Sequence, residues 1–182
     1  YKTRKVRDAL QRIGHLEHVT VLPALGMDEP WGYRNKAQFP VGLVKDQFTL
    51  GFYAARSHNL INIEQCPIQH GVAMIRKFIH TYNIPVYQES THRGIIRHVV
   101  TKVGFRSHQL MIIIVTNGEL PRKKELVSIL REGLPAVPGI IQNFQMDKTN
   151  VVLGRKNVTL WGSDYIMDAI GDIKFKISPL SF

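Results

Sequence analysis

Basic side chains recur on one face of two predicted strands. Arg34 and Lys36 alternate along the first strand, while His98, Lys102 and Arg106 share one face of the second. Cations along a sheet face can follow a phosphate backbone, so the pattern predicts contacts with RNA. The plainer alternative is that any solvated strand face carries Lys and Arg.

The charge balance favours the same class of partner. The sequence has 24 Lys and Arg against 14 Asp and Glu, a formal net charge of +10. Neutralising phosphates releases counterions, so nucleic-acid binding uses such a surplus. A merely soluble basic protein is the alternative, because net charge does not say where the charges lie.

Few residues could catalyse a reaction within this chain alone. Cys66 is the only cysteine, so no disulfide can form within the chain, and a lone cysteine near a helix start is more often a small buried side chain than a nucleophile. His15 and His18 form the closest histidine pair, but they lack further ligands at fixed spacing. No glycine loop of the G-x-G-x-x-G or G-x-x-x-x-G-K-[ST] type is present. We therefore expect neither a catalytic residue nor a cofactor in this chain.

Apolar spacing and alternation predict the elements that position these residues. A period near 3.6 predicts helices at 4–13, ended by Gly14, at 68–82, begun by Pro67, and at 121–131. A period of two predicts a hairpin of strands 32–41 and 48–52, and a strand at 94–106. Further strands are expected at 110–116, apolar on both faces, and at 139–144, 150–153, 158–161 and 173–177. The predicted fold class is α+β, with a mainly antiparallel sheet, a few packed helices and no Rossmann domain within this chain.

The N-terminal residues and the lengths of the apolar runs indicate the cellular compartment. No run approaches the roughly 18 apolar residues that a membrane span needs. The basic residues 1–5 are not followed by an apolar signal core, and position 1 is not Met. We expect an internal piece of a cytoplasmic protein without a membrane partner.

Short segments along nearly the whole chain resemble, in order, the bacterial 23S rRNA (uracil-5-)-methyltransferase family. Each segment is short, and their joint order and spacing carry the resemblance. They are residues 33–42 (YRNKAQFPVG), 51–53 (GFY), 66–69 (CPIQ), 94–99 (GIIRHV), 115–118 (VTNG), 142–143 (QN), 149–151 (TNV), 160–162 (LWG) and 177–182 (ISPLSF).

The resemblance implies the middle piece of a longer enzyme. Residues 1–176 would be a central RNA-binding domain, and 177–182 would begin the connection to a Rossmann-like catalytic domain. In the family a cysteine thiolate adds to C6 of uracil, C5 takes the methyl group from S-adenosyl-L-methionine, and a carboxylate removes the C5 proton. The family places these groups in the catalytic domain, so the resemblance implies that this chain alone is inactive.

Two further residues have roles only through the resemblance. Phe182 would lie next to the motif that contacts the cofactor and the target base. Cys66 matches the last cysteine of a four-cysteine 4Fe-4S site found in many members, whose other ligands would precede Tyr1. Some members lack this cluster.

The function expected from the sequence is to bind RNA, most of all 23S rRNA, and to help present a uridine for methylation. Such a base must be unstacked before it can react. Two alternatives stay open: a structural spacer without RNA affinity of its own, and tRNA as the substrate.

Overall fold

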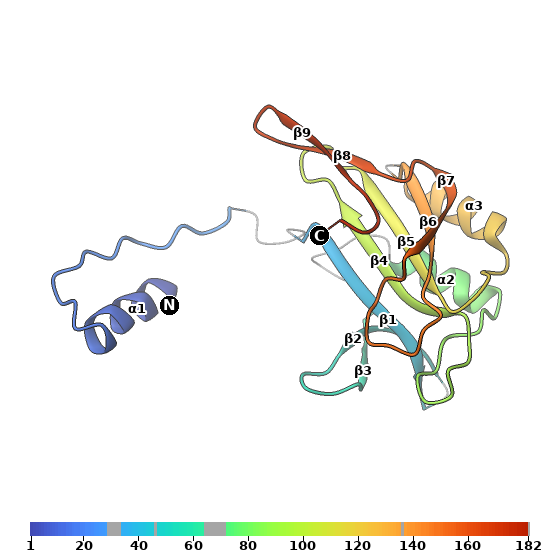
Figure 1. The fold of residues 1–182 in the computed structure, drawn as a ribbon, viewed down its shortest axis with the longest axis horizontal. Helices are drawn as coiled ribbons and strands as arrows, with labels where there is room; N and C mark the ends of the chain where they lie inside the picture. Colours follow the sequence, from blue (N-terminus) through green and yellow to red (C-terminus); the bar gives the residue numbers. More distant parts are fainter. Residues whose placement is uncertain (29–33, 46, 64–71, 136, 182) are drawn as a thin grey trace. The chain divides into compact units, whose positions relative to one another are not determined.

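The chain forms two compact units, Tyr1–Pro30 and Trp31–Phe182 (Figure 1). The computed structural model describes residues 1–28, 34–45, 47–63, 72–135 and 137–181. The boundary expected after residue 176 falls inside the second unit.

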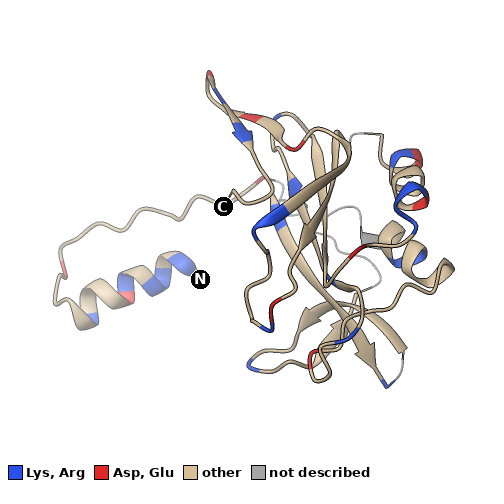
Figure 2. Cartoon of the chain, turned by 45° about the vertical axis from the view of Figure 1, so that its right-hand side comes forward, with Lys and Arg blue, Asp and Glu red and all other residues tan. Residues whose placement is uncertain are grey.

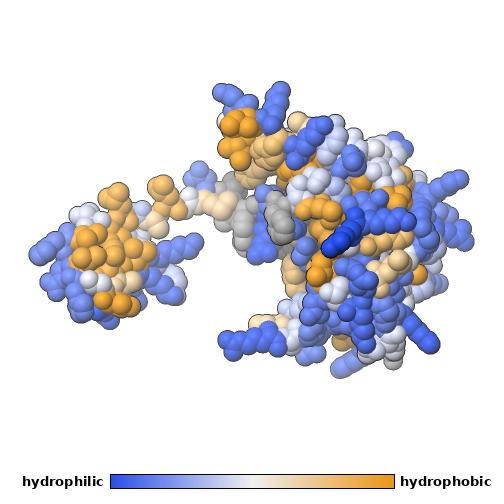
Figure 3. Space-filling model, viewed as in Figure 1, coloured by the Kyte–Doolittle hydropathy of each residue, from blue (hydrophilic) through white to orange (hydrophobic). Residues whose placement is uncertain are grey.

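The first unit contains the predicted N-terminal helix. It comprises α1 (Lys2–Asp8) and a π-helical turn, η1 (Ala9–Ile13), with Gly14 as the C-cap, in agreement with the predicted stop. Val6 is 51% exposed and Ile13 is 81% exposed. The apolar stripe of this helix is therefore uncovered within the described part of its unit, and Figure 3 shows apolar side chains on its surface.

The second unit is built on a mixed sheet with the strand order β3-β2-β1-β4-β5-β6-β7. All neighbouring strands are antiparallel except β5 and β6, which are parallel and joined through α3. The α+β class with a mainly antiparallel sheet is thus confirmed. The strands are β1 (Lys36–Val44), β2 (Gln47–Tyr53), β3 (Leu60–Asn62), β4 (Ile96–Val103), β5 (Leu110–Thr116), β6 (Gly139–Phe144) and β7 (Lys156–Gly162).

Both faces of this sheet carry buried side chains. Helices α2 (Val72–Thr81) and α3 (Lys123–Gly133) cover one face, where the sheet packs against residues such as Ile75 and Leu126 (Figure 1). The opposite face has a smaller cluster around Val100 and Ile113. Each fully buried side chain of this size contributes roughly 1.5–3 kcal/mol.

A separate hairpin and a loop cover that opposite face. Strands β8 (Ile166–Ile170) and β9 (Ile173–Ile177) pair with each other and contribute Ile166 and Ile177 to the smaller cluster, and Val152 packs there from the β6–β7 loop. Two segments remote in sequence from β4 therefore enclose the face on which the second set of cations was predicted.

Several predicted bounds were wrong for identifiable reasons. Residues 150–153 form no strand, because side chains hold this loop in place: Gln145 accepts at Oε1 from the Asp147 N–H and donates to the Val151 carbonyl. Strand β4 ends at Val103 instead of continuing to 106, because the chain turns at Gly104. Strands β3 and β8 were not predicted. None of the helices among the described residues is long and apolar enough to cross a membrane.

Candidate nucleic-acid interface

Lys36 and Lys102 are the two predicted cations that the sheet brings together. They face each other in the register of β1 and β4. Lys102 is only 2% exposed, and its ammonium donates to the Ser178 carbonyl at 2.8 Å and to the Ser181 carbonyl. Burial, with the charge of Lys36 as a second cause, lowers the pKa of Lys102 to about 8. The predicted solvated position of Lys102 is therefore wrong: its ammonium holds the C-terminal segment.

His98 lies on the same face of β4 as Lys102, as predicted, but it carries no charge at neutral pH. Burial, with the charge of the neighbouring Arg97 as a second cause, lowers its pKa to about 4. Its Nδ1 is buried and has no hydrogen-bond partner among the described residues. His98 is therefore a neutral polar group instead of a phosphate-binding cation.

Arg34 and Arg106 lie outside the strands on which they were predicted. Arg34 is exposed and precedes β1, and Arg106 is exposed in the β4–β5 turn. Its guanidinium donates to the Gly171 carbonyl at 2.6 Å. Figure 2 shows Lys and Arg on both units. Because Lys102 is buried and His98 is uncharged at neutral pH, the five predicted residues do not form one row of solvated cations.

Arg97 is the buried cation that the sequence prediction missed. It is 4% exposed, and its guanidinium donates to the carbonyls of Gln145 at 2.8 Å, Asp147 at 2.7 Å and Thr149 at 3.1 Å. It also lies 4.3 Å from the centre of the Tyr87 ring. The alternation placed Arg97 on the same strand face as Val99, but the strand register shifts between Ile96 and His98, and Arg97 contacts the β6–β7 loop instead.

A polar chain continues from Tyr87 to the same loop. The Tyr87 hydroxyl lies 2.7 Å from His92 Nδ1, and His92 Nε2 lies 3.0 Å from the Met146 carbonyl. A carbonyl only accepts, so Nε2 carries the proton and Nδ1 accepts from the hydroxyl. Gly94 permits this arrangement: its φ is +99°, and a Cβ there would collide with the Val86 carbonyl.

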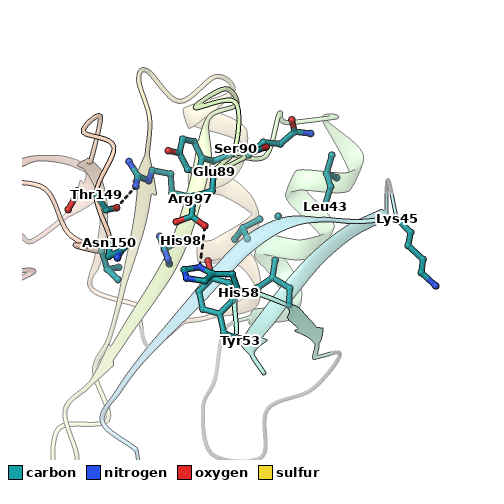
Figure 4. Close-up of a pocket in the computed structure, with 16 residues that line it drawn as sticks. Leu43, Lys45, Tyr53, His58, Glu89, Ser90, Arg97, His98, Thr149 and Asn150 are labelled. Atoms are coloured by element: carbon teal, nitrogen blue, oxygen red, sulfur yellow. Dashed lines mark hydrogen bonds and ion pairs between the residues drawn. The ribbon is translucent and has the colours of Figure 1, made fainter. Parts of the chain in front are cut away.

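Arg97 and Tyr87 line a cavity of about 620 Å³, which we call the β1–β4 cavity (Figure 4). Its other walls come from β1, from β2 and β3, and from the loop that precedes β4. Tyr53 is 42% exposed, and its ring centre lies 5.4 Å from that of His58, which in turn lies 3.3 Å from the Glu89 carboxylate. Burial, with Glu89 as a second cause, raises the pKa of Tyr53. Besides Tyr53, His58, Glu89, Arg97 and His98, the lining includes Val41, Gly42, Leu43, Lys45, Leu60, Tyr87, Gln88, Ser90, Thr149, Asn150 and Val152.

The whole chain aligns with proteins named as RNA methyltransferases. It is 45% identical to one from Clostridium tetani and 44% identical to one from Halalkalibacterium halodurans, over 100% of this chain in each case. The whole of this chain is therefore similar to part of these RNA methyltransferases. It spans 41% of the length of these relatives. No family model matches the chain.

The fold of this chain is also found in a solved structure. The Pyrococcus abyssi tRNA (uracil-54, C5)-methyltransferase, in complex with S-adenosyl-L-homocysteine, matches 100% of this chain and 43% of its own length. The TM-score is 0.74 and the identity is 24%, so this likeness shows a shared fold.

Two of the residues expected to have roles fall outside the described residues. Cys66 lies within 64–71, and Phe182 is the last residue. Among the described residues, no group of three or more His, Cys, Asp or Glu side chains could hold a metal ion.

Proposed function

We propose that this chain is the RNA-binding segment of an S-adenosyl-L-methionine-dependent RNA (uracil-5-)-methyltransferase, and that it helps present the target uridine. The observation that carries the proposal is the similarity of the whole chain to RNA methyltransferases that extend well beyond it. Methyl transfer would be performed by residues outside these 182, where the family resemblance places the nucleophile, the base and the cofactor loop. S-adenosyl-L-methionine would be the cofactor of that longer protein, and Cys66 would be a ligand where the longer protein holds a 4Fe-4S cluster.

The RNA contact surface that we propose is centred on the face of β1 opposite α2 and α3. Ala37 belongs to the core under the helices, so its neighbour Lys36 lies on the opposite face of β1. Lys36 is half-buried there. Arg34 is exposed just before the first residue of β1, and Arg106 is exposed in the turn just after the last residue of β4. We assign phosphate contacts to these three residues. Of the other two predicted residues, Lys102 anchors the C-terminal segment, and His98 lines the β1–β4 cavity.

The salt dependence of RNA binding tests this assignment. In the intact protein, log affinity for RNA should fall with log salt concentration. Combining Arg34→Ala with Lys36→Ala should make this slope less steep by about two. The matched control is Arg122→Ala with Lys124→Ala, which removes two exposed cations from the start of α3, Arg122 at its N-cap and Lys124 in its first turn, on the other side of the sheet. Equal slopes for the two double variants would refute the assignment.

The reaction is tested separately with S-adenosyl-L-methionine carrying a labelled methyl group. We expect the intact protein to convert uridine to 5-methyluridine, detected by mass spectrometry after nuclease digestion. The family resemblance makes 23S rRNA the first substrate to test. tRNA is the second candidate, because the structural neighbour is named as a tRNA enzyme. Label that appears in neither RNA, or in a base other than uracil, would refute the proposed activity.

A structural spacer is the competing role for this segment. Its polar faces would then be covered by other parts of the intact protein. In that case both double variants would bind RNA with the affinity and salt slope of the unaltered protein.

A further inference from the structure

We propose that the β1–β4 cavity binds one unstacked nucleobase of the RNA, distinct from the uridine that is methylated. The inference rests on the proposed function and specifies what this segment recognises besides phosphate. Bases are held in proteins by stacking on aromatic rings and by hydrogen bonds to their edges. The cavity offers groups for both.

An accessible aromatic ring lines the cavity. Tyr53 is 42% exposed, and the His58 ring is inclined to it by 59°. Figure 4 shows Tyr53 and His58 side by side, with the Glu89 carboxylate opposite. The contact between His58 Nδ1 and the Glu89 carboxylate, at 3.3 Å, links two walls of the cavity. Stacking a base on an aromatic side chain contributes roughly 1–3 kcal/mol, so Tyr53 could hold a base without any charge being involved.

Two buried polar atoms of adjacent residues lack partners at this cavity. Arg97 Nε and His98 Nδ1 are both buried, and neither has a hydrogen-bond partner among the described residues. Both side chains line the cavity. Leaving a buried polar group unpaired costs about 1–3 kcal/mol. The N–H of Arg97 can donate to a base, and the neutral imidazole of His98 can accept or donate according to its tautomer. The edge of a base carries both donors and acceptors, so it can pair with these atoms when the two side chains turn toward the cavity.

The charges around the cavity favour a neutral ligand over a phosphate. Both terminal nitrogens of Arg97 already donate to backbone carbonyls, and His98 is uncharged at neutral pH. Glu89 places a carboxylate in the lining, which opposes an anion. The Lys45 side chain points away from His98 and Tyr53 in Figure 4. A volume of about 620 Å³ lies within the range of small-ligand sites and is ample for a nucleoside.

The bound base would not be the one that is methylated. The lining residues include no thiol that could add to C6 of uracil. A nearby nucleotide held here would instead offset part of the few kcal/mol needed to unstack the RNA around the target. The cavity would thus act as a second anchor that favours RNA with an extruded base.

The first test uses free nucleosides and the intact protein. Saturation-transfer NMR with uridine, cytidine, adenosine and guanosine should detect binding, whereas inorganic phosphate should not compete. Tyr53→Phe should keep the signal, because the ring remains, and Tyr53→Ala should weaken binding about tenfold. Phe105→Ala is the matched control, because Phe105 is 65% exposed and does not line the cavity. Competition by phosphate, or equal weakening by Tyr53→Ala and Phe105→Ala, would overturn the proposal.

The second test uses a structured RNA with 2-aminopurine placed at successive positions. We expect the fluorescence at one position to change on binding, and the change to be absent with Tyr53→Ala but present with Phe105→Ala. If RNA binds with a slope that depends on Arg34 and Lys36 while neither nucleosides nor 2-aminopurine respond, the cavity proposal fails and the proposed function stands. If RNA does not bind at all, both fail.

Discussion

Replacing Arg97 with methionine removes three hydrogen bonds to one loop and keeps most of the side-chain volume. The bond to the Gln145 carbonyl is fully buried and should contribute about 2 kcal/mol. Those to Asp147 and Thr149 are partly buried, so water can replace them, and each should contribute about 0.5 kcal/mol. The contact with the Tyr87 ring adds about 1 kcal/mol.

The expected loss is therefore about 4 kcal/mol, and it should be local to residues 145–151. Amide hydrogen exchange of the intact protein measures it directly, because local opening free energies set the protection of each segment. A loss of this size corresponds to protection lowered by up to about a thousandfold. Arg97→Lys should be intermediate, because a single ammonium cannot span three carbonyls as the guanidinium fork does.

The matched control is Arg122→Met, which removes an arginine whose side chain is 62% exposed and pairs with Glu125. A surface pair contributes about 0–1 kcal/mol, so this variant should change exchange by less than about fivefold, and only near the start of α3. Exchange at 145–151 within about threefold of the unaltered protein in Arg97→Met would refute the idea that the guanidinium holds this loop.

Three further predictions concern the other buried or bridging groups. The imidazole of His98, followed by NMR, should titrate with a midpoint near 4, whereas a midpoint near 6.5 would show that the ring is solvated. Because its pKa in the folded protein lies below 6.5, local stability should fall as the pH is lowered from about 6.5 to about 4. His98→Gln should remove that pH dependence. Lys102→Met should increase amide exchange in 178–181, because it removes both hydrogen bonds that the Lys102 ammonium donates to that segment, and unchanged exchange would mean that other contacts hold it. Asp168→Ala should increase exchange at 105–107 by about tenfold, because the carboxylate accepts all three of those backbone N–H groups; a change elsewhere but not there would contradict this role.

Local patterns predicted the elements well because each depends on a few neighbouring residues. All seven residues of β5 are buried, as its unbroken apolar sequence predicts, and its bounds are those predicted. The predicted hairpin is formed by β1 and β2. The basic helix at 4–13 is present and ends at Gly14.

The solvation of each strand face could not be predicted in the same way. A period of two places His98 and Lys102 on one side of β4, but whether that side is wet depends on what packs against it. Here the cover comes from the β6–β7 loop and from the β8–β9 hairpin, which are remote in sequence. The bond from Lys102 to Ser178 spans 76 positions, so no local pattern could have revealed it.

The net charge of +10 therefore overstates the charge that this segment can offer to RNA. Arg97 and Lys102 are buried and bind backbone carbonyls, which makes them internal supports of the fold. Counterion release counts only the cations that reach phosphates. The salt dependence that this segment contributes should accordingly reflect exposed cations such as Arg34, while Arg97 should influence RNA binding only through the shape of the β1–β4 cavity. Arg97→Met should then weaken RNA binding by a similar factor at low and at high salt, and a marked fall in the salt slope would show that the guanidinium contacts phosphate directly.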